Sequence, residues 1–146
     1  MIPKLARISI LALLCFTLVT CNKNDDVVPY VFVNLSINLS DPQFIDLQAV
    51  GNAVKITGGV RGIVVYRKSI DEFLAYDRNC TYKASNDSAR VDIEKSLGFA
   101  FCEHCGSQFS LVFEGTVLKG PASRQLLLYR TSYNRTFNVL YISNFQ

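Results

Sequence analysis

The sequence predicts an all-β domain, because short apolar runs with strand character recur between turn residues over most of its length. In residues 33–37 apolar and polar side chains alternate strictly, which is the pattern of a strand with one buried face. Residues 62–66, Gly-Ile-Val-Val-Tyr, are almost continuously apolar and are expected at the centre of a sheet. No stretch of useful length repeats its apolar residues with the helical period. The spacing of the strands favours a small antiparallel barrel or sandwich.

Turn residues set the limits of the first expected strands. A strand at residues 30–37 ends before Asp41-Pro42, a turn pair. Residues 44–50 and 53–57 are expected as two short strands, joined by a Gly-Asn pair that suits a tight turn. A Gly-Gly pair then ends this part of the pattern.

The strand at residues 62–66 is expected to pair with residues 71–76, its antiparallel neighbour across a short connection. Residues 83–97 are polar and mixed, and Val91 and Ile93 mark one brief strand within them. Residues 99–101 lead into a Cys-containing loop. The last expected strands are residues 108–113, 116–118, 125–129 and 137–142, separated by Glu-Gly and Gly-Pro turns.

Composition favours one globular domain without affinity for nucleic acid. The 146 residues are 49% hydrophobic, which is typical of a folded chain with a single core. The formal charge is +3, but Lys4 and Arg7 belong to the N-terminal segment described next. Without them, 13 basic residues remain against 12 acidic ones, so the domain offers no basic surface for nucleic acid.

Residues 1–20 have the order of a secretory signal. Lys4 and Arg7 give a charged start, and the apolar run of residues 8–19 is shorter than the roughly 20 residues that span a bilayer. The run ends in Leu-Val-Thr-Cys, which is similar to the lipobox of bacterial lipoproteins. In that family the chain is cut before the cysteine, here Cys21, and its sulfur carries the lipid.

This resemblance divides the chain into three parts. Residues 1–20 are a lipoprotein signal peptide, residues 21–29 are a polar tether, and residues 30–146 are the folded domain. Lipid on Cys21 is expected to anchor the domain to a membrane of the bacterial cell envelope without a spanning helix.

The remaining cysteines point to a metal site or a disulfide. Of five cysteines, Cys15 leaves with the signal peptide and Cys21 carries the lipid, so Cys80, Cys102 and Cys105 remain. Three cannot all pair within one chain, and at least one is therefore a free thiol or a ligand. Cys102 and Cys105 lie three positions apart on a turn that ends in glycine, which lets both sulfurs face one centre.

Four segments, taken in order, resemble the Rieske iron–sulfur domain. They read Tyr-Asp-Arg-Asn-Cys (76–80), Cys-Glu-His-Cys-Gly-Ser-Gln-Phe (102–109), Gly-Thr-Val-Leu-Lys-Gly-Pro-Ala (115–122) and Leu-Leu-Leu-Tyr (126–129). In that family two loops read Cys-x-His and Cys-x-x-His, then Gly-Ser-x-Phe, and a Gly-Pro turn forms a third loop that shields the cluster from water. The resemblance implies a small Rieske-like antiparallel barrel or sandwich with a two-loop cluster-binding subdomain, over roughly residues 43–143. The chain also looks like a lipoprotein subgroup of Bacteroidetes-type bacteria.

The ligand positions depart from the Rieske pattern. A Rieske centre holds one iron by two cysteines and the other by two histidines. By the resemblance, Cys80 and Cys102 take the thiolate positions, while Tyr82 and Cys105 stand where the histidines belong. His104 is the single histidine of the chain, so counting alone excludes a centre with two imidazoles.

Three alternatives follow for the site. The first is a [2Fe–2S] cluster on Cys80, Cys102 and Cys105, with the Tyr82 phenolate, His104 or an outside ligand as the fourth. Its anionic ligands would lower the reduction potential toward roughly −400 mV and remove the pH dependence that ligating histidines give. The second is a zinc site of the three thiolates and His104. The third is metal-free, with Cys80 in a disulfide to Cys102 or Cys105 worth about 3 kcal/mol in the chain-entropy model.

The expected function follows from the first alternative. The protein is expected to be an electron carrier rather than an enzyme, and to transfer one electron to a redox partner protein. A structural or interaction module that kept the fold after losing the cofactor is the alternative, because fold does not fix function. No Ser-His-Asp set can be built around His104, and no phosphate-binding glycine loop occurs.

Overall fold

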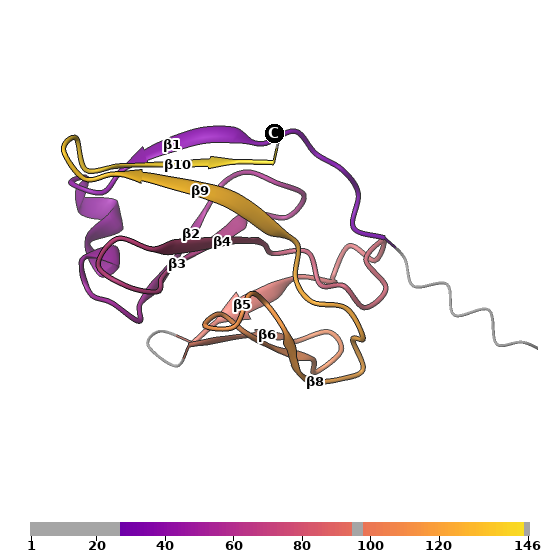
Figure 1. Ribbon diagram of the computed structural model, residues 1–146. Coiled ribbons are helices and arrows are strands. Elements are labelled where there is room, and N and C mark those ends of the chain that lie inside the picture. Colours follow the sequence, from indigo (N-terminus) through magenta and orange to yellow (C-terminus); the bar gives the residue numbers. More distant parts are fainter. Residues whose placement is uncertain (1–26, 95–97, 145–146) are drawn as a thin grey trace, which may run out of the picture.

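The computed structural model describes residues 27–94 and 98–144, so the signal peptide, Cys21 and most of the tether lie outside these ranges. Within them the chain forms two antiparallel sheets and one short 3-10 helix (Figure 1). One sheet has the strand order β1-β10-β9-β4-β3-β2 and the other the order β5-β6-β7-β8. The elements are β1 (Asn34–Asn38), η1 (Pro42–Gln48), β2 (Ala53–Ile56), β3 (Ile63–Arg67), β4 (Phe73–Asp77), β5 (Val91–Ile93), β6 (Phe99–Cys102), β7 (Gln108–Ser110), β8 (Val117–Lys119), β9 (Leu128–Asn134) and β10 (Val139–Ser143). The predicted all-β class is confirmed.

The strands form three layers, with β3 and β4 in the middle one (Figure 1). Ile63 and Val65 of β3 point into a first core that β1 and β10 cover. Val64 and Tyr66 point the other way, into a second core that the four-stranded sheet covers. Burial on both faces explains why residues 62–66 are apolar without alternation.

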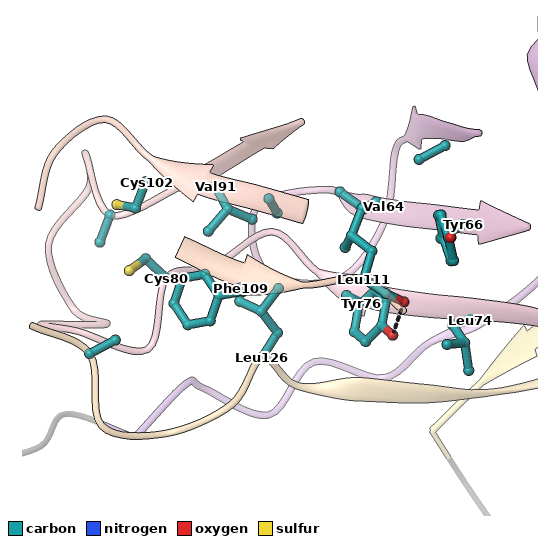
Figure 2. Packing of buried hydrophobic residues seen from close by; sticks show 14 residues of the cluster. Val64, Tyr66, Leu74, Tyr76, Cys80, Val91, Cys102, Phe109, Leu111 and Leu126 are labelled. Atoms are coloured by element: carbon teal, nitrogen blue, oxygen red, sulfur yellow. Dashed lines mark hydrogen bonds between the residues drawn. The ribbon is translucent and has the colours of Figure 1, made fainter. Parts of the chain in front are cut away.

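The second core extends from β3 and β4 to the cysteine loops. Phe109 of β7 and Val91 of β5 are fully buried in it together with Cys80 and Cys102. Figure 2 shows these two cysteines at one end of the cluster. The first core contains no cysteine among the described residues.

The prediction of a strand at residues 44–50 is wrong, because most of this segment belongs to the 3-10 helix η1. Its two buried side chains, Phe44 and Leu47, are three positions apart, whereas Ile45 is exposed. A strand would instead bury every second side chain. Phe44 itself lies at a kink within η1. Among the described residues, no helix has the length and apolar character needed to cross a membrane.

Other expected strands have different limits, and β1 begins at Asn34 instead of residue 30. β7 ends at Ser110 instead of residue 113, because the chain turns there and the Phe113 N–H donates to Ser110 Oγ at 3.1 Å. β9 begins at Leu128 and continues to Asn134, beyond the expected end at residue 129. The pairing expected between residues 62–66 and 71–76 is confirmed as the antiparallel pair of β3 and β4.

Tyr76 of β4 offers a test of the packing between the sheets. Its hydroxyl donates to the carbonyl of Leu111 at 2.9 Å inside the second core (Figure 2). The change Tyr76→Phe leaves that carbonyl buried without its partner, which is expected to lower the free energy of unfolding by about 1–2 kcal/mol. Tyr141→Phe, on a half-exposed side chain of β10, is the control and should change it little. Equal effects in chemical denaturation would contradict the role of this hydrogen bond.

Candidate metal centre

Three thiols come together from two loops. The first loop follows β4 and carries Cys80, and the second joins β6 to β7 and carries Cys102 and Cys105. Each of the sulfurs of Cys80, Cys102 and Cys105 lies within 4.8 Å of the other two, and Cys80 Sγ lies 3.6 Å from Cys105 Sγ. The thiols are free, since a disulfide has a bond of only about 2.05 Å. Cys80 and Cys102 are buried, whereas Cys105 is half-buried. The structure thus brings together all three cysteines that the sequence analysis singled out.

The first loop is fixed by the buried carboxylate of Asp77 at the end of β4. This carboxylate accepts hydrogen bonds from the Tyr129 hydroxyl at 2.6 Å and from the backbone N–H groups of Val60 and Asn79 at 2.6 and 2.7 Å. Burial raises the pKa of Tyr129 and the Asp77 carboxylate raises it further, so the hydroxyl stays protonated and donates. The chain then reaches Cys80, whose own N–H is hydrogen-bonded across the loop at 2.8 Å.

The second loop is a tight turn between β6 and β7. Cys102 ends β6, and its N–H donates to the carbonyl of Ser107 at 2.9 Å. The N–H of Gly106 donates back to the carbonyl of Cys102 at 2.7 Å. Gly106 has a φ of +75°, which glycine adopts without strain. This turn places the Cys105 sulfur beside that of Cys102.

A third segment, residues 120–124, forms hydrogen bonds to both loops. The Ala122 N–H donates to Ser107 Oγ at 2.9 Å, and the same oxygen lies 3.1 Å from Cys105 Sγ. Thr81, next to Cys80, donates from its hydroxyl to the carbonyl of Arg124 at 2.6 Å. The Rieske resemblance predicted the Gly-Pro turn as a third loop, but the contact of Ser107 with this loop and with Cys105 was not predicted. The only signal for Ser107 was its place in the Gly-Ser-x-Phe segment.

The environment of the sulfurs opposes the ionisation of two thiols and favours that of the third. Burial raises the pKa of Cys80 and of Cys102, although the N–H groups of Tyr82 and Cys105 respectively act against it. Burial acts the same way on Cys105, but its hydrogen bonds with the side chain and the backbone of Ser107 outweigh burial and lower the pKa of this thiol. A bound cation would favour the thiolate form of all three sulfurs at once, because metal ions bind the thiolate rather than the thiol.

The other candidate ligands lie less close to this centre. Tyr82 is half-buried against the second core, with Lys83 Nζ 5.6 Å from the centre of its ring. This arrangement suits a packed aromatic, and ligation by its phenolate stays a prediction. His104 is exposed, and its Nε2 lies 3.4 Å from Asn86 Nδ2. In the described part of the chain, no ring nitrogen joins the three-sulfur group, so the zinc site with His104 is not assembled.

Comparison with known proteins bears on the fold. No protein-family model matches the chain, and no curated protein does. Among solved structures, the cyanobacterial plasma membrane Rieske protein PetC3 from Synechocystis PCC 6803 is similar at 26% identity, with a TM-score of 0.54. The match covers 79% of this chain and 100% of that one. The fold is Rieske-like.

The residues present do not fit the metal centre of a standard Rieske domain. Such a centre needs two imidazoles, and the one histidine of this chain lies near Asn86 and outside the three-sulfur group. They do fit a centre bound by thiolates, because three sulfurs converge at the end of a hydrophobic core. Soft thiolate donors select zinc, copper(I) or iron–sulfur centres over calcium and magnesium. The Rieske-like domain therefore carries a candidate metal site of altered ligand type.

Proposed function

We propose that this chain is an envelope lipoprotein whose Rieske-like domain binds an iron centre through Cys80, Cys102 and Cys105 and carries single electrons to a partner protein. The observation that carries the proposal is the convergence of the three sulfurs within 4.8 Å of one another. Iron bound there would supply a one-electron couple. The form that the Rieske resemblance implies is a [2Fe–2S] cluster, with Tyr82 as a candidate fourth ligand.

The protein side of this function is to hold the centre at the surface and at a membrane. Cys105 is half-buried while the other two thiols are buried, so the centre is nearest to the outside at Cys105. The exposed side chains of Glu103 and His104 lie beside it and would contact a partner. Lipid on Cys21 would keep the domain at the envelope, in keeping with the plasma membrane location that the Synechocystis protein's description gives.

Iron loading tests the proposal. The full chain, produced in a bacterial host with an iron–sulfur assembly system and extracted from its membranes, is expected to be coloured and to contain stoichiometric iron. Reduction should take up one electron per centre. Its potential should not depend on pH in the range where ligating histidines titrate, because no imidazole is a ligand. A colourless protein without iron would contradict the proposal.

The second candidate is a cluster-free structural or interaction module in which a disulfide joins the two loops. It is favoured by the separation of 3.6 Å between Cys80 Sγ and Cys105 Sγ, which brings thiols from the two loops close to each other. Thiol titration of the unfolded, lipid-anchored chain separates the candidates. One free thiol, from Cys102 or Cys105, indicates the disulfide form, whereas three free thiols after metal removal indicate the metal-binding form.

A further inference from the structure

The spacing of the three sulfurs indicates how many metal ions they surround. A tetrahedral ion with bonds of about 2.3 Å to sulfur holds two thiolates about 3.8 Å apart. Cys80 Sγ and Cys105 Sγ are 3.6 Å apart, and Cys102 Sγ lies within 4.8 Å of both. One of the three separations therefore matches a single ion, and the two with Cys102 exceed that span by at most about 1 Å.

A two-iron cluster needs a wider arrangement. Each iron of a [2Fe–2S] cluster takes two protein ligands besides its bridging sulfides, so three thiolates must be divided between the two irons. The sulfur on the second iron is then separated from the other two by the iron–iron distance in addition to the bonds. No sulfur of the three stands apart in this way, because all three distances stay within 4.8 Å.

Strand β5 ties both loops together and so holds this spacing. On one side, the Val91 N–H donates to the carbonyl of Arg78 at 2.7 Å, close to Cys80. On the other side, Val91 is paired with Cys102 in the ladder between β5 and β6. Moving the loops apart to accommodate a second iron would break one of these two sets of hydrogen bonds.

We propose that Cys80, Cys102 and Cys105 bind one tetrahedral divalent ion, iron or zinc, in place of a two-iron cluster. This inference rests on the proposed function in assuming that the thiols bind metal, and it adds the number of ions. A single iron ion keeps the one-electron couple. A single zinc ion keeps the site but has no redox chemistry.

Metal content and cobalt binding test the inference on the full, lipid-anchored chain. Elemental analysis is expected to find one iron or one zinc per chain, without acid-labile sulfide. After metal removal under reducing conditions, Co²⁺ is the probe, and its visible bands should saturate at one equivalent with the intensity of a tetrahedral thiolate site. His104→Asn should give the same titration, because this side chain faces Asn86. Cys102→Ser should weaken cobalt binding at least tenfold.

The possible outcomes bear separately on the single-ion site and on electron transfer. Two irons with two sulfides per chain would overturn the single-ion site and leave the electron carrier standing. One iron without sulfide supports both. One zinc supports the single ion and overturns electron transfer. A metal-free chain that does not bind cobalt after reduction overturns both, and an unchanged cobalt titration in Cys102→Ser overturns the single-ion site.

Discussion

Replacing Cys80 by serine is expected to abolish tight metal binding. Cys80 is the contribution of the first loop to the sulfur group, and the other two thiols come from the second loop. A serine hydroxyl is a harder, far less acidic donor than a thiol. Removing a residue that only orients a metal ligand costs 10- to 100-fold in affinity, so the loss of the ligand itself should exceed about 100-fold. Competition with a chromogenic chelator measures this change.

The matched control for this substitution is Glu103→Gln. Glu103 lies between Cys102 and Cys105 on the same turn, but its carboxylate is exposed and is not part of the sulfur group. The Glu103→Gln variant should bind metal as tightly as the unaltered chain. Circular dichroism would show that both variants keep their strands. If Cys80→Ser kept the full affinity, the second loop alone would hold the metal, and the two-loop site would be wrong.

Asp77→Ala is expected to give the largest loss of stability, about 3 kcal/mol or more. The substitution leaves the Tyr129 hydroxyl and the N–H groups of Val60 and Asn79 without their acceptor in the interior. Each buried donor that loses its partner costs about 1–3 kcal/mol. There is little room for another side chain to take over, since a Cβ on Gly59 would collide with both the carboxylate and the Tyr129 hydroxyl. Denaturant unfolding measures the free energy directly.

Asp71→Ala is the control for Asp77→Ala. Asp71 forms an ion pair with Arg135, but both side chains are exposed, and such pairs contribute little. The unfolding midpoint of the Asp71→Ala variant should therefore stay almost unchanged. Because Asp77 fixes the loop that carries Cys80, Asp77→Ala should also weaken metal binding, whereas Asp71→Ala should not. Similar midpoints for the two variants would show that the Asp77 network does not stabilise the fold.

Local patterns in the sequence were enough for the strands and the thiols. Residues 62–66 are apolar because both faces of β3 are buried, and continuous apolarity is visible without coordinates. The prediction for residues 44–50 was wrong, because so short an apolar run is compatible both with a strand and with a 3-10 helix such as η1. The three cysteines were found from their spacing and order, which are properties of the chain itself.

The supporting contacts of the site could not be read in the same way. Asp77 meets Val60 and Tyr129, and Ser107 meets Ala122, across 15 to 52 positions of the chain. Such pairs depend on how the sheets close, and a single sequence carries no sign of them. The direction of His104 also had to come from the structure, since its position between two cysteines suits a ligand and an exposed side chain equally.

The two separate cores bear on how the protein matures. Zinc fingers are unfolded until metal arrives, because the ion replaces the core that they lack. Here the first core, under β1 and β10, contains no thiol among the described residues, and in the second core an uncharged cysteine packs as a small hydrophobe. Folding of the domain is therefore not expected to require a bound metal ion. The domain can fold with its three thiols unoccupied, and a metal ion can bind to the preformed site afterwards.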